Sequence, residues 1–137
     1  MSLSKVFDIA GSAMSAQSVR LNTTASNLAN AGSVHGDPER VYRAKQPVFA
    51  PFQNALADQT GSSGVRLRGI VTSDAPLGVE HRPDHPDANE NGEVYVSNVN
   101  TVEEMVNMLS ASRSYQNNIE LLNTTKELML QTLSLGR

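Results

Sequence analysis

The residues best suited to chemistry lie in segment 80–87, where two histidines alternate with carboxylates. Imidazole and carboxylate groups are common metal ligands. His81 and His85 stand four positions apart, a spacing that would place them on one face of a helix. Pro83 and Pro86 exclude that helix, because proline lacks an N–H and clashes with the preceding turn. We therefore expect an exposed polar turn here and no metal site.

The following segment, residues 87–92, resembles the opening of an EF-hand calcium loop. The twelfth position of such a loop carries a bidentate glutamate, and in this chain that position is Asn98. The prolines upstream also block the helix that enters an EF-hand. We expect a turn that leads into a strand.

Other chemistry finds no support in the residues. The chain has no cysteine, no serine stands in a Gly-x-Ser-x-Gly motif, and His35 lies in a loop without an assignable partner. The net charge is −3 at pH 7 and lysine and arginine form no cluster, which argues against nucleic-acid binding. We expect no enzyme activity, no cofactor, no small-molecule substrate and no nucleic-acid partner.

We expect two long helices, one near each end of the chain, with the other segments between them. Residues 3–30 contain no proline, and Gly32 is placed to stop the helix. The large apolar residues of this helix recur every seven positions, with smaller residues between them, in the three-and-four spacing of a coiled-coil seam. These residues are Phe7, Met14, Leu21 and Leu28, with Ala10, Gln17, Thr24 and Ala31 between them.

The second helix is expected over residues 101–135. Asn100 or Thr101 can cap it, and Glu103 or Glu104 can complete a capping box. Three-and-four spacing recurs along it at Met105, Met108, Ser112, Tyr115, Ile119, Leu122, Lys126, Met129 and Leu133.

The middle of the chain reads as loops and short strands, because it holds all six prolines. Strands are expected over 65–72, 46–52 and 93–96, and an exposed loop over 54–64. The expected fold is mainly α with a small β-rich insert, and its two long terminal helices pack as an antiparallel coiled-coil-like pair. The three parts are residues 1–32, 33–100 and 101–137. The first residues lack the apolar stretch of a secretory signal, and no run approaches the roughly 18 apolar residues of a membrane span.

Neither helix can stabilise itself fully. Arg113 and Lys126 have no acidic residue three or four positions away, so intrahelical ion pairs are missing. The first helix carries a stripe of small or short polar residues, namely Gly11, Ser15, Ser18, Asn22 and Ser26. Such a stripe suits either a poorly optimised surface helix or a close contact with a neighbour. The chain has three Tyr, three Phe and no Trp, so the core of a single chain is too thin to cover both helices. This composition favours the second alternative, in which neighbouring subunits cover them.

Two segments carry a family resemblance. The sequence Asn-Leu-Ala-Asn at 27–30 resembles the N-terminal signature of bacterial flagellar rod and hook proteins, and residues 98–118 resemble the C-terminal helix of the same family. Residues 31–33 lead into a charged loop at 37–40 before Tyr42, where many members have Thr followed by Gly-Phe or Gly-Tyr. This departure favours the proximal-rod subtype.

The resemblance implies a structural subunit of the proximal rod, part of a torque-transmitting, export-conducting tube in the periplasm. It also implies passage through the flagellar type III export apparatus without a cleaved signal peptide. The implied partners are other copies of the chain, other rod subunits, the adapter to the membrane-embedded ring and the distal rod. The competing hypothesis is a cytoplasmic coiled-coil adaptor or homodimeric binding module.

The residues expected at subunit interfaces follow from the seam and the motif. Asn27 and Asn30 could hydrogen-bond a neighbour, with local capping as the alternative for Asn30. Arg113 is expected to make a charge contact between subunits, because its own helix offers no acid. The full set is Phe7, Met14, Leu21, Asn27, Leu28, Asn30, Met105, Met108, Arg113, Tyr115, Ile119, Leu122 and Met129.

Overall fold

The computed structural model describes residues 3–52 and 63–136 and contains two helices and five strands in that part of the chain. The elements in chain order are α1 (Leu3–Ala29), β1 (Val34–His35), β2 (Lys45–Phe52), β3 (Gly64–Thr72), β4 (Gly78–His81), β5 (Glu93–Val96) and α2 (Thr101–Leu135). Two long helices and a small β-rich insert were expected, and the structure confirms that part of the prediction, with the insert formed by small antiparallel sheets.

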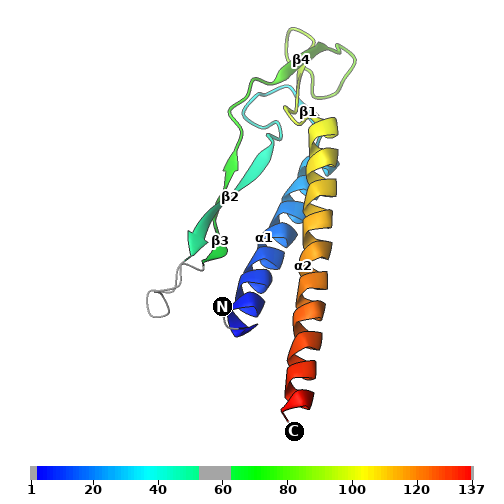
Figure 1. Cartoon of the computed structure of the whole chain (residues 1–137). Helices are drawn as coiled ribbons and strands as arrows, with labels where there is room; N and C mark the ends of the chain where they lie inside the picture. The colour runs from blue at the N-terminus through cyan, green and yellow to red at the C-terminus, as the bar shows by residue number, and fades with distance from the viewer. Residues whose placement is uncertain (1–2, 53–62, 137) are drawn as a thin grey trace.

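The helices lie side by side, and the two chain ends lie at the same end of the pair (Figure 1). The bounds of α2 are those expected from the sequence. Its cap is Asn100, whose side chain accepts hydrogen bonds from the backbone N–H groups of Val102 (3.1 Å) and Glu103 (3.4 Å). At about 1.5 Å per residue, α2 is roughly 52 Å long and α1 roughly 40 Å, so α2 runs past α1.

The end of α1 differs from the expectation. The helix stops at Ala29, and Gly32 does not adopt the left-handed conformation of a glycine stop, since Gly92 is the one residue with positive φ in the described ranges. Instead the Asn30 amide nitrogen Nδ2 donates to the Ser26 carbonyl at 2.8 Å and satisfies a carbonyl of the last turn.

The strands form two small antiparallel sheets. β2 and β3 make a hairpin of two strands, whose register shifts between Val48 and Phe49. β1, β5 and β4, in that order, make the second sheet beyond the start of α2 (Figure 1). The sequence predicted β2, β3 and β5, but missed β1 and β4, which have two and four residues. Residues 54–62 of the expected loop lie outside the described residues, and Gly64 begins β3.

Most of segment 80–92 forms the turns that the sequence predicted, but Glu80 and His81, expected in the turn, belong to strand β4. His81 ends β4, residues 83–92 form loops and turns, and β5 follows directly. No group of three or more His, Asp or Glu side chains is placed to hold a metal in the described part of the chain. Neither described helix has an apolar stretch long enough to cross a membrane.

One side of α2 is covered, and its residues follow three-and-four spacing. Half of this set is the expected seam, namely Met108, Tyr115, Leu122 and Met129, all half-buried. The other half lies one residue before the expected positions, at Glu104, Ala111, Asn118 and Thr125, which are buried except for half-buried Asn118. The reason is size, because the short side chains of Ala111 and Thr125 fit closely against the neighbouring helix, whereas the sequence pattern was read from the bulkiest apolar residues.

Ala111 provides a test of the packing between the helices, because it is 0% exposed. Ala111→Leu should lower the stability of the helix pair by about 1–3 kcal/mol, since the added methyl groups have no space. The matched control is Ser110→Leu, which changes the exposed neighbouring position. The measurement is a urea titration followed by circular dichroism, at a protein concentration at which the helices have formed. Equal urea midpoints for the two variants would contradict the close packing at Ala111.

Candidate subunit interface

The most buried polar side chain of the described structure is Asn27, which is 1% exposed. Its Nδ2 donates to the carbonyl of Lys45 at 2.9 Å, and its Oδ1 accepts the Lys45 backbone N–H at 2.9 Å. The carboxamide thus pairs with β2 as a peptide group of a further strand would. Oδ1 also accepts the Tyr42 hydroxyl at 2.9 Å, and Tyr42 lies 3.1 Å from Ser26 Oγ. These contacts hold the first residue of β2 against α1.

A second asparagine holds the same segment from the other helix. Asn98, two residues before the cap of α2, accepts the backbone N–H of Ala44 on Oδ1 at 2.8 Å. Its Nδ2 donates to the Ala75 carbonyl at 3.0 Å and to the Ser73 carbonyl at 3.4 Å. Arg43 donates to the same two carbonyls. Sequence reasoning assigned no role to Asn98, whose only signal was its place in the C-terminal motif.

The two asparagines of the Asn-Leu-Ala-Asn motif therefore make their hydrogen bonds within the chain. Asn27 is buried and fully engaged, so a bond to a neighbouring subunit would require the contacts with Lys45 and Tyr42 to open first. Asn30 bonds the end of its own helix, which is the local capping that the sequence left as an alternative.

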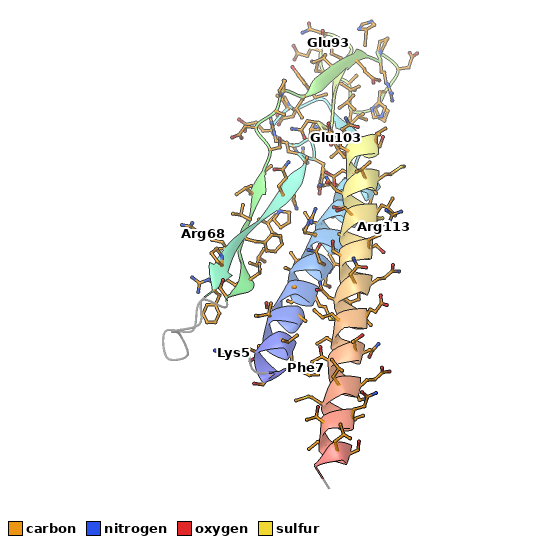
Figure 2. The ribbon with its side chains drawn as sticks, in the orientation of Figure 1. Lys5, Phe7, Arg68, Glu93, Glu103 and Arg113 are labelled. Carbon is orange, nitrogen blue, oxygen red and sulfur yellow. The ribbon has the colours of Figure 1, made fainter. Side chains whose placement is uncertain are left out.

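The expected seam residues of α1 lie on its covered side. Phe7, Met14, Leu21 and Leu28 are half-buried, and Figure 2 shows Phe7 between the two helices. The stripe of small residues on α1 is exposed except for half-buried Ser26. Since α2 and the hairpin cover other parts of α1, this stripe is left as an uncovered surface.

α2 leaves large apolar side chains uncovered near both of its ends. Its first third exposes four large apolar side chains, at Val102 (68%), Met105 (60%), Val106 (62%) and Leu109 (54%). Its last turns expose four leucines, namely Leu128, Leu130, Leu133 and Leu135, and carry no charge after Glu127. We call these two sets the upper patch and the C-terminal patch. Clusters of this kind mark contact surfaces more often than solvent-facing ones.

The remaining expected residues of α2 are also exposed. Met105 belongs to the upper patch and is 60% exposed, and Ile119 is 38% exposed, so both keep apolar surface available to a neighbouring subunit. Arg113 is exposed and points away from α1 (Figure 2), and it forms no ion pair with any described residue. Contact of these three residues with a neighbouring subunit stays a prediction.

One cavity of about 440 Å³ lies where α1, the hairpin and the start of α2 meet. Arg20, Lys45 and Glu104 line it together with apolar and amide side chains, and no ion pair joins these three residues. Its lining contains no histidine or serine.

The hydrogen bonds of Asn27 can be tested with two substitutions that remove different numbers of them. Asn27→Ala removes three hydrogen bonds and leaves the N–H and C=O of Lys45 without these partners, so exchange of the Lys45 amide proton should accelerate on the order of 10-fold. Asn27→Asp keeps the acceptor for Lys45 and Tyr42 but loses the donor, so its effect should be smaller. Hydrogen exchange on the folded chain measures both. Identical rates in Asn27→Ala and the unsubstituted chain would show that the carboxamide does not hold β2.

Two family models match the two ends of the chain. The model described as "Flagella basal body rod protein" matches residues 7–36, which cover most of α1 and its motif. The model described as "Flagellar basal body rod FlgEFG protein C-terminal" matches residues 90–135, which cover β5 and α2. Asn27 and Asn98, which join the ends to the middle, lie one in each matched region.

Similar proteins extend the match to the middle of the chain. The flagellar basal-body rod protein FlgC of Salmonella typhimurium is 53% identical over 137 residues, which cover 100% of both chains. FlgC of Yersinia enterocolitica is likewise 53% identical over 100% of both chains. FlgC of Buchnera aphidicola subsp. Schizaphis graminum is 44% identical over 99% of each. With this identity along its whole length, the chain belongs to the FlgC family of flagellar basal-body rod proteins, which is a structural family and not one of enzymes.

Proposed function

We propose that this structural subunit of the flagellar basal-body rod is built into the rod through the exposed apolar side chains of α2 and the exposed stripe of small residues on α1. The observation that carries the proposal is the exposure of large apolar side chains near both ends of α2, since every member of the upper patch and of the C-terminal patch is more than half exposed. Burying a Val, Leu or Met side chain contributes roughly 1.5–3 kcal/mol, so covering eight of them is a large driving force for assembly.

The two patches lie near opposite ends of one helix and differ in composition. A contact between the upper patch of one copy and the C-terminal patch of another joins two different surfaces, so each copy keeps one of each surface available. Contacts of this heterologous kind produce rings or open helical polymers, whereas a contact between like surfaces closes as a dimer. This property supports a tube of subunits over the homodimeric module that the sequence left as an alternative.

The helices also form an antiparallel coiled-coil-like pair in this proposal. The covered residues of α2 recur at intervals of four and three from Glu104 to Met129, which is the spacing of a coiled-coil seam. Residues 1–32 and 101–137 would then form the polymerisation core, and residues 33–100 the insert carried on it. Uncharged small residues on the exposed stripe of α1 suit a close approach by a neighbouring helix.

The finer assignments rest on the motifs. The charged loop at 37–40 supports the proximal rod as the position, with the periplasm as the compartment. Export would use the flagellar type III apparatus without a cleaved signal peptide. The proposed partners are other copies of this chain, other rod subunits, the adapter to the membrane-embedded ring and the distal rod. Arg113 would pair with an acidic group of one of them.

Leu109 tests the exposed side of α2 without disturbing the chain's own packing. Leu109→Asp should keep the chain out of the rod and abolish motility in a strain that has no other copy, because a carboxylate would be buried between subunits. The matched control, Gln116→Asp, changes an exposed polar residue one heptad later and should leave most motility. Motility assays and the amount of chain in isolated basal bodies measure both. Normal motility of Leu109→Asp would remove the upper patch from the interface.

The dependence of helix on assembly gives a second test. α2 has many weak helix formers and no intrahelical ion pair along its middle, so the purified chain at micromolar concentration should show little helix by circular dichroism. The helix content should rise with assembly. A cytoplasmic adaptor would instead be strongly helical when dilute and would melt cooperatively. Full helicity of the dilute monomer would therefore contradict assembly-dependent helices.

A further inference from the structure

The outer edge of β2 cannot accept another strand. Pro47 pairs with Ile70 and Pro51 pairs with Val65, and since proline has no N–H to give to the ladder, both pairs direct their backbone groups away from the hairpin. Lys45 and Phe49, each two positions from one of these prolines, also direct their backbone groups outward. At Lys45 the outward N–H is already bonded to Asn27. Phe49 is left as the one outward N–H of β2 that is available.

The outer edge of β3 has the opposite character. By the same pairing, the outward N–H groups of β3 belong to Val65, Leu67, Ile70 and Thr72. The N–H of Val65 donates to Ser12 Oγ at 3.1 Å, which confirms that it faces away from β2. For Leu67, Ile70 and Thr72, the described residues provide no partner strand. The upper half of β3 is therefore an open edge without proline.

This open edge is also apolar and basic. Leu67 is 42% exposed and Ile70 is 52% exposed. Arg66 and Arg68 are exposed on the same strand, and Figure 2 shows Arg68 pointing away from both helices. An exposed, apolar edge of this length favours pairing with another strand, and a hairpin of two strands is only marginally stable by itself.

A complementary edge lies on the same chain, in the sheet beyond the start of α2. β4 is an edge strand. The Arg82 N–H donates to the Gly92 carbonyl at 2.9 Å, so Arg82 directs its backbone groups toward β5. Because this direction alternates along an antiparallel strand, the N–H groups of His81 and Val79 face away from β5. Val79 is 54% exposed. The surrounding segment, residues 74–93, holds six carboxylates and one arginine, and Arg82 binds Glu80 at 2.6 Å. We call this segment the acidic tip.

We infer that the open edge of β3 in one copy pairs with the outer edge of β4 in a neighbouring copy, so that the hairpin and the acidic tip form one sheet across the subunit boundary. This inference rests on the proposed function. The charges are complementary, with Arg66 and Arg68 facing the carboxylates of the tip. The hairpin lies alongside α1 while the tip lies beyond the top of α2 (Figure 1), so a neighbour displaced along the helices brings its tip to the hairpin.

Cysteine cross-linking in assembled basal bodies tests the pairing, because the chain has no cysteine of its own. Leu67→Cys and Val79→Cys are combined in one chain, which is supplied as the only copy of this rod protein. A short bismaleimide should then give dimers and higher oligomers of the chain. Each single variant should give none, and a mixture of the two single variants should give dimers without higher oligomers.

The outcomes separate the two proposals. If the double variant is present in basal bodies and does not cross-link, the strand pairing is wrong and the rod function stands. Cross-linking of Leu67→Cys alone would show β3 against β3, and cross-linking only to a different protein would identify another occupant; either overturns the inference. Absence of the chain from basal bodies would overturn the proposed function and this inference with it.

A backbone variant tests the hydrogen bonds themselves. Ile70→Pro, in the cross-linking background, removes an outward N–H and leaves the ladder with β2 intact, since Pro47 opposite it contributes none. The cross-linked fraction should fall about fivefold, the change expected from one lost hydrogen bond. Ile70→Thr keeps the N–H but loses the apolar side chain, and should lower the fraction by less than about twofold. Equal yields from the two variants would show that the backbone of β3 makes no bond to the neighbour.

Discussion

A helix of 35 residues that has one helix beside it cannot bury all of its large apolar side chains, and this constraint underlies the rest of the structure. α1 covers the side of α2 that runs from Glu104 to Met129, where Ala111 and Thr125 bring the backbones close. The opposite side keeps Val102, Val106 and Leu109 in solvent. Because no element in the described part of the chain covers them, the proposed assembly would bury these side chains against other subunits.

The insert is attached to the helices by polar contacts. Asn27 of α1 and Asn98 before α2 each use a side-chain amide to bond the backbone around Ala44 and Lys45, as a neighbouring strand would. A hydrogen bond depends on direction and distance more strictly than an apolar contact does. The two asparagines therefore fix where the hairpin leaves the helices, although the apolar core around Val94 is small.

The insert in turn presents two sheets of unequal charge. Arg66 and Arg68 make the hairpin basic, while the tip around Glu80 and Glu93 is acidic. The prolines of β2 close one edge of the hairpin, and β3 leaves the other edge open. In the proposed assembly, the helices would carry the apolar contacts between subunits and the strands would carry the directional ones.

Local features of the sequence determined the helices, three of the five strands, a cap at Asn100 or Thr101 and the family, because periodicity, capping residues and motifs act over a few neighbouring residues. The tertiary structure decided which side of α2 is covered, and it buries Glu104, Ala111 and Thr125, each one residue before a position that the sequence pattern selected. It also decided the role of Asn27, since its partner Lys45 is 18 residues away and nothing local marks that contact. Contacts of this kind depend on how elements approach in space, which the spacing of residues along one element does not encode.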